Sequence, residues 1–191
     1  ASAVLAVPMD PDRAAYISCG TWGLVGVEAS APILTEQARA ANFTNEAGVE
    51  GTTRFLRNVM GLWALTETLR AWEQAGRGVA LTAIVEEAAA EPTPDALLDI
   101  DDDAFLAPGD MPARIEAWLR ERSLAVPQSQ AGLVRLIVES LAQAFARAVW
   151  AVAELSGIGS SASTSSEGAR ATRCCANSRP SMRAFPWSPD P

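Results

Sequence analysis

The feature that most limits the possible folds is one long apolar helix, predicted over residues 129–157. Ser129 stands where such a helix begins, because its hydroxyl can accept a hydrogen bond from a free amide of the first turn. Gly157 stands where a chain commonly leaves a helix in the left-handed conformation. A helix with this pattern buries one face in a core. The residues expected to face inward recur every three or four positions: Leu133, Leu136, Ile137, Leu141, Ala144, Ala148, Val152 and Leu155.

Earlier in the chain, residues 14–28 predict two short strands joined by a tight turn. Tyr16 and Ile17 lead into a Cys-Gly-Thr bend at residues 19–21, and further apolar residues lead out of it. Residues 40–48 are polar around a single phenylalanine, and they are too mixed to predict a strand.

Helical spacing begins near Thr52. It predicts a helix that runs to about Trp72 and is stopped at residues 76–78, where two glycines flank an arginine. The apolar stripe of this helix would comprise Phe55, Val59, Leu62, Thr66 and Leu69. The next segments are a predicted helix over 81–90, an acidic loop over 97–108 and a predicted helix over 111–122.

The chain changes character after the long helix. Residues 159–191 are rich in serine, end in a proline-rich run and show no periodicity. We therefore expect one folded unit over residues 1–157 and a disordered tail over residues 158–191.

Composition excludes several kinds of chemistry. The chain has no histidine, which rules out Ser-His-Asp catalysis, Cys-His catalysis and histidine metal ligands within it. With 15 Lys and Arg against 23 Asp and Glu, the net charge is −8, which argues against nucleic acid and against an anionic membrane as partners. The sequence shows neither an apolar run as long as a membrane span nor a secretory signal pattern at its start.

The cysteines indicate the compartment. Cys19, Cys174 and Cys175 have neither the even count of a disulfide framework nor the spacing of a metal site. A reducing, cytoplasmic location is therefore expected.

Two groups of polar residues are candidates for binding. In the bend, Gly20 lets the backbone approach a ligand, and Thr21 adds a hydroxyl that can donate to a phosphate oxygen, although such a turn also occurs in ordinary hairpins. On the helix expected after Thr52, Asn58 lies in line with Arg54 and Gly61, where its amide could read sugar hydroxyls or simply face solvent.

The acidic run Asp99–Asp103 invites a calcium interpretation. A calcium loop that started at Asp99 would need glycine at its sixth position and glutamate at its twelfth, where this chain has Ala104 and Asp110. A solvated acidic loop is the better interpretation, and no metal ligand is predicted.

Several of these segments together resemble one family. Residues 15–28 (AYISCGTWGLVGVE) and 40–63 (AANFTNEAGVEGTTRFLRNVMGLW) are closely similar to the C-terminal half of rhamnulokinases, which are FGGY carbohydrate kinases. The run from Asn42 to Trp63 is specific enough to separate rhamnulokinases from other sugar kinases. Shorter similarities lie at residues 32–35, 105–111 and 133–145, and the resemblance covers about residues 1–157.

The resemblance implies a fold and a reaction. The fold would be α/β: an incomplete C-terminal domain of the actin-like, ribonuclease-H-like ATPase fold, rich in helix in this part. The reaction would transfer the γ-phosphoryl group of ATP, with Mg²⁺, to the 1-hydroxyl of L-rhamnulose. In such enzymes the catalytic base is the Asp of a His-Asp-Thr triplet, which would lie just before Ala1. No catalytic residue is therefore expected within the chain, and its partner would be the N-terminal kinase domain.

The resemblance also assigns binding residues. Thr21 and Gly20 would contact the ATP phosphates, and Asn58 would help to bind the ketose. Thr66 occupies a position that contacts ATP and is usually glutamine in this family. The isolated chain is expected to be inactive.

Two alternatives stay open, and one further expectation concerns the tail. The chain could belong to another FGGY sugar kinase or actin-like ATPase, or it could be a non-enzymatic remnant. The family also expects a glycine triplet in the adenosine-binding segment after the long helix, and this chain has none. Back-translation of residues 165–180 in a shifted frame gives V-G-G-G-A-R-N. We therefore expect the tail from about Ser165 onward to be a frameshifted reading, which would leave the apolar face of the long helix partly exposed.

Overall fold

The computed structural model describes residues 14–157 and 161–162, and it contains one mixed sheet and a set of helices. The sheet has the strand order β3-β4-β2-β1-β5. β1, β2, β4 and β3 pair antiparallel, while β5 runs parallel to β1. The strands are β1 (Ala14–Cys19), β2 (Trp22–Ala29), β3 (Thr44–Ala47), β4 (Thr53–Met60) and β5 (Ser161–Ala162).

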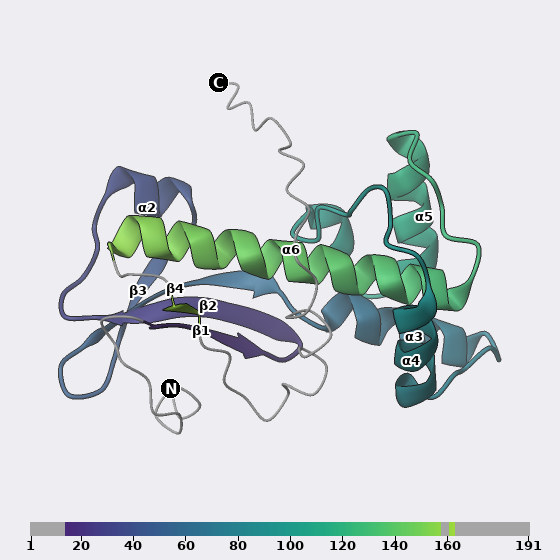
Figure 1. Ribbon diagram of the computed structural model, residues 1–191, viewed down its shortest axis with the longest axis horizontal. Coiled ribbons are helices and arrows are strands. Elements are labelled where there is room, and N and C mark those ends of the chain that lie inside the picture. Colours follow the sequence, from purple (N-terminus) through teal and green to yellow (C-terminus); the bar gives the residue numbers. More distant parts are fainter. Residues whose placement is uncertain (1–13, 158–160, 163–191) are drawn as a thin grey trace.

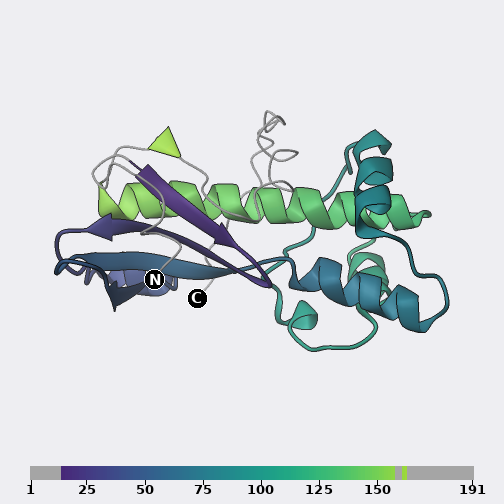
Figure 2. The same cartoon turned by 90° about the horizontal axis from the view of Figure 1, so that it is seen from below.

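The helices gather around α6. Figures 1 and 2 show α6 lying along the sheet, with its first turns among the other long helices. α6 packs against β1, β2 and β4 of the sheet and against the helices α3 and α4. The helices are α2 (Glu36–Ala40), α3 (Trp63–Gln74), α4 (Leu81–Ala90), α5 (Met111–Glu121) and α6 (Gln130–Ser156), with a 3₁₀ turn η1 (Asp103–Phe105).

The long helix forms as its sequence predicts. Ser129 Oγ accepts a hydrogen bond from Gly132 N at 2.8 Å, and Gly157 has a φ of 69°. Of the eight side chains expected inside, Leu155 is half-buried and the other seven are buried. The expected partial exposure of this apolar face is therefore wrong. The frameshift that motivated it, and the predicted disorder of the tail, concern residues that lie almost wholly outside the described part of the chain.

By length and composition alone, α6 could also cross a membrane. It has 27 residues, and its most apolar 18-residue window has a mean hydropathy of 1.4. Its contacts instead make it the core helix of this fold, because the sheet and α4 cover its apolar side.

The hairpin of β1 and β2 is confirmed, but the helix predicted from Thr52 to Trp72 is wrong in its first half. Residues 53–60 form β4, and α3 begins only at Trp63. The error has a physical cause: β4 is buried on both faces, with Phe55 and Val59 on one and Leu56 on the other, so its apolar residues do not alternate with polar ones.

The polar stretch at residues 40–48 contains a strand that its composition did not predict. β3 is short, lies at the edge of the sheet and is largely exposed, so its residues need no apolar pattern. The helices predicted over 81–90 and 111–122 are confirmed as α4 and α5.

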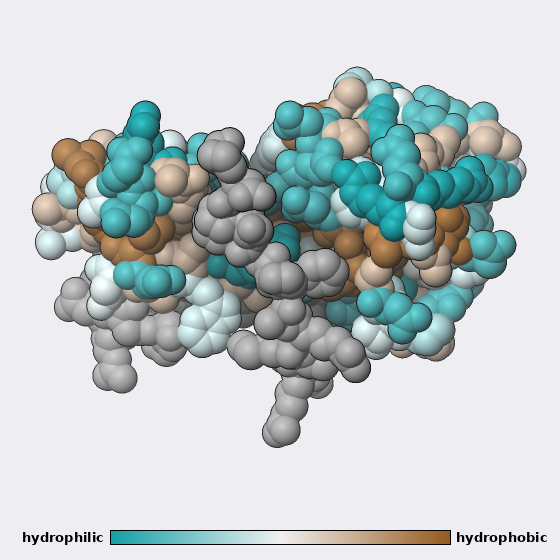
Figure 3. Space-filling model, turned by 90° about the horizontal axis from the view of Figure 1, so that it is seen from above, coloured by the Kyte–Doolittle hydropathy of each residue, from teal (hydrophilic) through white to brown (hydrophobic). Residues whose placement is uncertain are grey.

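The two faces of the sheet have different neighbours. Gly23 faces α6, because a side chain there would collide with the ring of Phe145. By the alternation of a strand, Leu24 points to the opposite face, and its cross-strand neighbours Ser18 and Asn58 share that face. Figure 3 shows one side of the molecule, where apolar residues surface in separate patches among hydrophilic ones.

Candidate functional site

The turn between β1 and β2 is bonded to the junction between β4 and α3, which we define as residues 60–63. Leu62 N donates to Gly20 O at 2.8 Å, and Trp63 N donates to Thr21 O at 3.1 Å. Gly61 makes this contact possible, since a Cβ there would collide with the Gly20 and Thr21 carbonyl oxygens. Two segments about forty residues apart are thereby held against each other by their backbones.

A shallow hollow of about 490 Å³ opens beside this contact, on the sheet face opposite α6. Its lining combines hydroxyl, amide, apolar and aromatic groups, as sites for small polar ligands do. The lining residues are Ser18, Cys19, Gly20, Trp22, Leu24 and Asn58.

Asn58 lies on β4 and not on a helix, so the predicted line of Arg54, Asn58 and Gly61 does not form. Arg54 and Asn58 do share a face, because they are four residues apart on one strand, but Gly61 follows the end of that strand. The Asn58 side chain is exposed. Within residues 14–157 its amide has no hydrogen-bond partner, so both its donor and its acceptor are free for a ligand.

Thr21 is at the tip of the turn, between two residues that line the hollow. Its side chain is exposed, and its hydroxyl has no partner within the described segment 14–157. The amide of Gly20 is occupied, because it donates to Trp22 O at 3.0 Å. An anion at this turn would therefore meet the Thr21 hydroxyl and not the Gly20 amide.

Thr66 lies one helical turn into α3 and is exposed. Its hydroxyl donates to Leu62 O of its own helix at 2.9 Å, and Thr66 does not line the hollow. The structure thus brings Gly20, Thr21 and Asn58 together at the hollow, whereas Thr66 lies outside its lining.

The acidic loop, residues 97–108, is more ordered than a solvated loop would be. Asp102 caps η1 by accepting from Ala104 N, and it also accepts from Trp118 Nε1 at 2.8 Å. These hydrogen bonds, with that of Trp118 the strongest, hold the pKa of Asp102 below its usual value.

The neighbouring carboxylate, Asp101, contacts the strand that carries Asn58. Asp101 Oδ1 accepts from Met60 N at 2.7 Å, and Asp101 Oδ2 pairs with Arg57 at 3.2 Å. The sequence did not point to this role. Its one signal was Ile100, an apolar residue next to Asp101 inside the acidic run. In the structure Ile100 is fully buried.

Two further ionisable groups of the hairpin stay neutral at physiological pH. Burial raises the pKa of the Cys19 thiol. Burial also raises the pKa of Tyr16 to about 12, against the smaller, opposite effect of Arg54. Among the residues described, no three of the types His, Cys, Asp and Glu come together as a metal site would need, and Cys174 and Cys175 lie outside that part.

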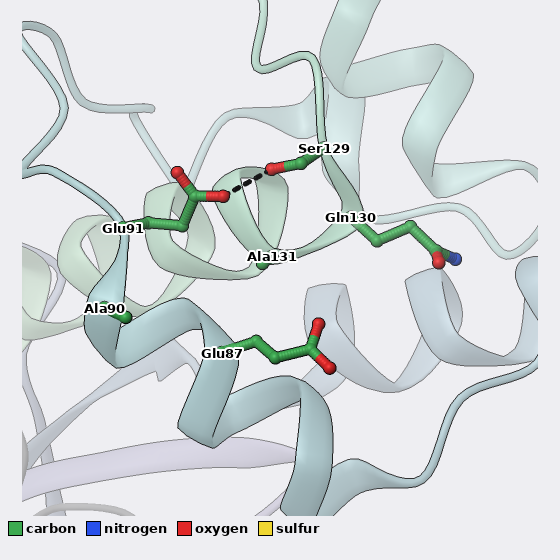
Figure 4. Close-up of a pocket in the computed structure, with 6 residues that line it drawn as sticks. All are labelled: Glu87, Ala90, Glu91, Ser129, Gln130 and Ala131. Atoms are coloured by element: carbon green, nitrogen blue, oxygen red, sulfur yellow. Dashed lines mark hydrogen bonds between the residues drawn. The ribbon is translucent and has the colours of Figure 1, made fainter.

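A second hollow, of about 440 Å³, lies between the end of α4 and the start of α6 (Figure 4). Ser129 Oγ donates to Glu91 at 2.6 Å across it. Ser129 caps the start of α6, Glu91 ends α4, and none of the predicted binding residues lines this hollow.

One comparison with known proteins identifies the domain. The family model for the "FGGY family of carbohydrate kinases, C-terminal domain" matches residues 15–165, which include both strands of the hairpin, β4 and every helix described above. The predicted fold class, the actin-like and ribonuclease-H-like ATPase fold, is thereby confirmed. The chain belongs to the FGGY family of carbohydrate kinases, of which it carries the C-terminal domain.

Proposed function

We propose that the chain forms one wall of the active site of an ATP-dependent L-rhamnulose kinase. The observation that carries the proposal is the free amide of Asn58 in the hollow. Asn58 belongs to the segment 42–63 that most closely resembles rhamnulokinases. An amide can donate to one sugar hydroxyl and accept from another, and Trp22 and Leu24 offer apolar surface beside it.

ATP fits the other end of the hollow. The exposed hydroxyl of Thr21 can donate to a phosphate oxygen, and it lies on the turn next to the lining residue Gly20. Magnesium usually keeps several waters and binds through substrate phosphates together with one or two carboxylates. When bound, it would neutralise part of the charge on the transferred phosphoryl group.

The proton acceptor must come from outside the hollow. None of its six lining residues is Asp or Glu. We assign this role to the Asp of the His-Asp-Thr triplet expected before Ala1, and the opposite wall of the cleft to an N-terminal kinase domain. In this arrangement the chain binds and orients both substrates, while the other domain supplies the base.

A titration of the ¹⁵N-labelled chain tests the proposal. L-rhamnulose should move the NMR signals of the Asn58 side-chain amide and of Leu24, and Mg-ATP should move those of Thr21. Asn58→Ala should weaken sugar binding alone and Thr21→Ala nucleotide binding alone, each by about 1–3 kcal/mol because one hydrogen-bonding partner is lost.

The alternatives give different results in the same titration. If L-ribulose or D-xylulose bound in place of L-rhamnulose, the chain would come from another FGGY sugar kinase. If neither sugar nor nucleotide moved any signal of the hollow, the assignment of substrates to this site would be wrong, as expected of a remnant that binds nothing.

A further inference from the structure

The backbone around Asn58 depends on a residue from a distant part of the chain. β3 pairs with β4 only as far as Thr44 and Leu56, so the edge of β4 beyond Leu56 has no neighbouring strand. The amide of Met60 lies on this open stretch, and Asp101 Oδ1 accepts its hydrogen bond at 2.7 Å. A carboxylate from the acidic loop thus takes the place of a strand partner.

The second oxygen of the same carboxylate reaches the backbone of Asn58 through Arg57. Asp101 Oδ2 pairs with the Arg57 guanidinium at 3.2 Å, and Arg57 Nε in turn donates to the carbonyl of Asn58 at 3.4 Å. The Arg57 and Asp101 side chains are 25% and 30% exposed, so water only partly screens the pair. One carboxylate therefore holds the Met60 amide directly and the Asn58 carbonyl through Arg57.

The acidic loop is itself firmly held, so it can serve as an anchor. Leu98 N donates to the buried Ser140 Oγ of α6 at 2.9 Å. Phe105 O accepts from Trp63 Nε1 at 3.1 Å. Ile100 and Phe105, on either side of Asp101, are fully buried.

We propose that Asp101 is a positioning residue for the sugar-binding amide: it fixes the end of β4 so that the Asn58 side chain points into the hollow. The role rests on the proposed function of Asn58. Asp101 does not line the hollow and touches no substrate there.

The test compares three variants of the full chain. Asp101→Ala removes both contacts. Asp101→Asn keeps an oxygen for Met60 N but loses the ion pair with Arg57. Asp103→Asn is the matched control, because Asp103 lies in the same loop with an exposed side chain that makes no hydrogen bond within the described residues.

In the chain without ligand, Asp101→Ala should shift or broaden the Asn58 side-chain amide signals, which are identified by their loss in Asn58→Ala. Asp103→Asn should leave them unchanged. With L-rhamnulose, Asp101→Ala should weaken binding roughly tenfold, because the misplaced Asn58 amide loses hydrogen bonding to the sugar. Asp101→Asn should weaken it only about threefold, because a partly exposed ion pair contributes little.

The double variant separates positioning from general destabilisation. If Asp101 acts through Asn58, Asp101→Ala should cause no further loss of sugar affinity in the Asn58→Ala background. An equal loss in both backgrounds, or unchanged Asn58 signals in Asp101→Ala, would overturn the proposal. Circular dichroism shows whether Asp101→Ala folds. If it does not fold, unchanged Asn58 signals in Asp101→Asn would overturn the proposal instead.

This design also distinguishes the two proposals from each other. A wild-type chain that does not bind L-rhamnulose would overturn the function proposed for Asn58. The signals of Asn58 in the ligand-free variants would still decide whether Asp101 fixes its position.

Discussion

At the scale of single residues, two glycines that meet at the same contact should tolerate a side chain very differently. A Cβ on Gly61 would collide with the backbone of the β1–β2 turn, whereas a Cβ on Gly20 would lie 3.7 Å from its nearest neighbour, Trp22 O. Gly61→Ala should therefore lower the free energy of unfolding by about 1–3 kcal/mol, as overpacking does. Gly20→Ala should leave it nearly unchanged. Urea denaturation of both variants measures this, and equal effects would contradict the structure.

Another prediction concerns Glu67, a buried carboxylate on α3. It accepts from Gly109 N at 3.0 Å and pairs with Arg70 at 2.6 Å. The hydrogen bond from Arg70 is the main reason why the pKa of Glu67 is lowered, against the effect of burial. A lowered folded-state pKa gives stability that is complete above the unfolded value of about 4.3 and is lost as pH falls through the folded pKa.

Glu67→Gln keeps an oxygen for Gly109 N but removes the charge. It should lower the stability at pH 7 by about 1 kcal/mol, as the loss of a charged hydrogen-bonding partner does. It should also flatten the decline of stability below pH 4.3. Thermal unfolding midpoints of both proteins between pH 7 and pH 3 measure the two slopes, and parallel curves would show that Glu67 has an ordinary pKa.

At the scale of elements, the sequence predicted correctly the helices and strands whose structure is decided by residues within the element itself. α6 carries its N-cap, its C-terminal glycine and its apolar face within one stretch, and the hairpin carries its own turn. β4 has the apolar spacing of a helix, because the burial of its residues depends on α6 and, at Phe55, on Phe43, which lie elsewhere in the chain. β3 could not be predicted, because an exposed edge strand needs no apolar pattern of its own and only pairs with a neighbouring strand.

The candidate site divides in the same way. Thr21 and Asn58 could be named from sequence because family resemblance marks them. Asp101 could not, because its contacts with Met60 and Arg57 join residues more than forty positions apart. A run of charged residues predicts a solvated surface, because the residues that pair with its side chains are known only once the fold is known.

The contact between α6 and the acidic loop can be tested through Ser140. Its buried hydroxyl donates to Leu136 O at 2.7 Å and accepts from Leu98 N at 2.9 Å. Ser140→Ala leaves the Leu98 amide buried without a partner, which should cost about 1–3 kcal/mol. Hydrogen exchange of the Leu98 amide should also accelerate. Ser129→Ala, which removes the exposed cap of the same helix, should cost about 1 kcal/mol and leave Leu98 protected.

At the scale of the whole molecule, the purified 191-residue chain should show no phosphorylation of L-rhamnulose. The hollow holds no carboxylate that could take the proton of the sugar hydroxyl, and loss of a general base typically costs about 10²–10⁴-fold in rate. A coupled assay for ADP release with L-rhamnulose and Mg-ATP measures this. Sugar-dependent release of ADP by the chain alone would refute the assignment of the base to another domain.

The backbone bonds from Gly20 and Thr21 to the start of α3 have a consequence for motion. Kinases of this kind are expected to close around their substrates. Because the turn is bonded to the junction and the junction to Asp101, we expect these segments to move together. The spacing between the hydroxyl of Thr21 and the amide of Asn58 is then the same before and after closure.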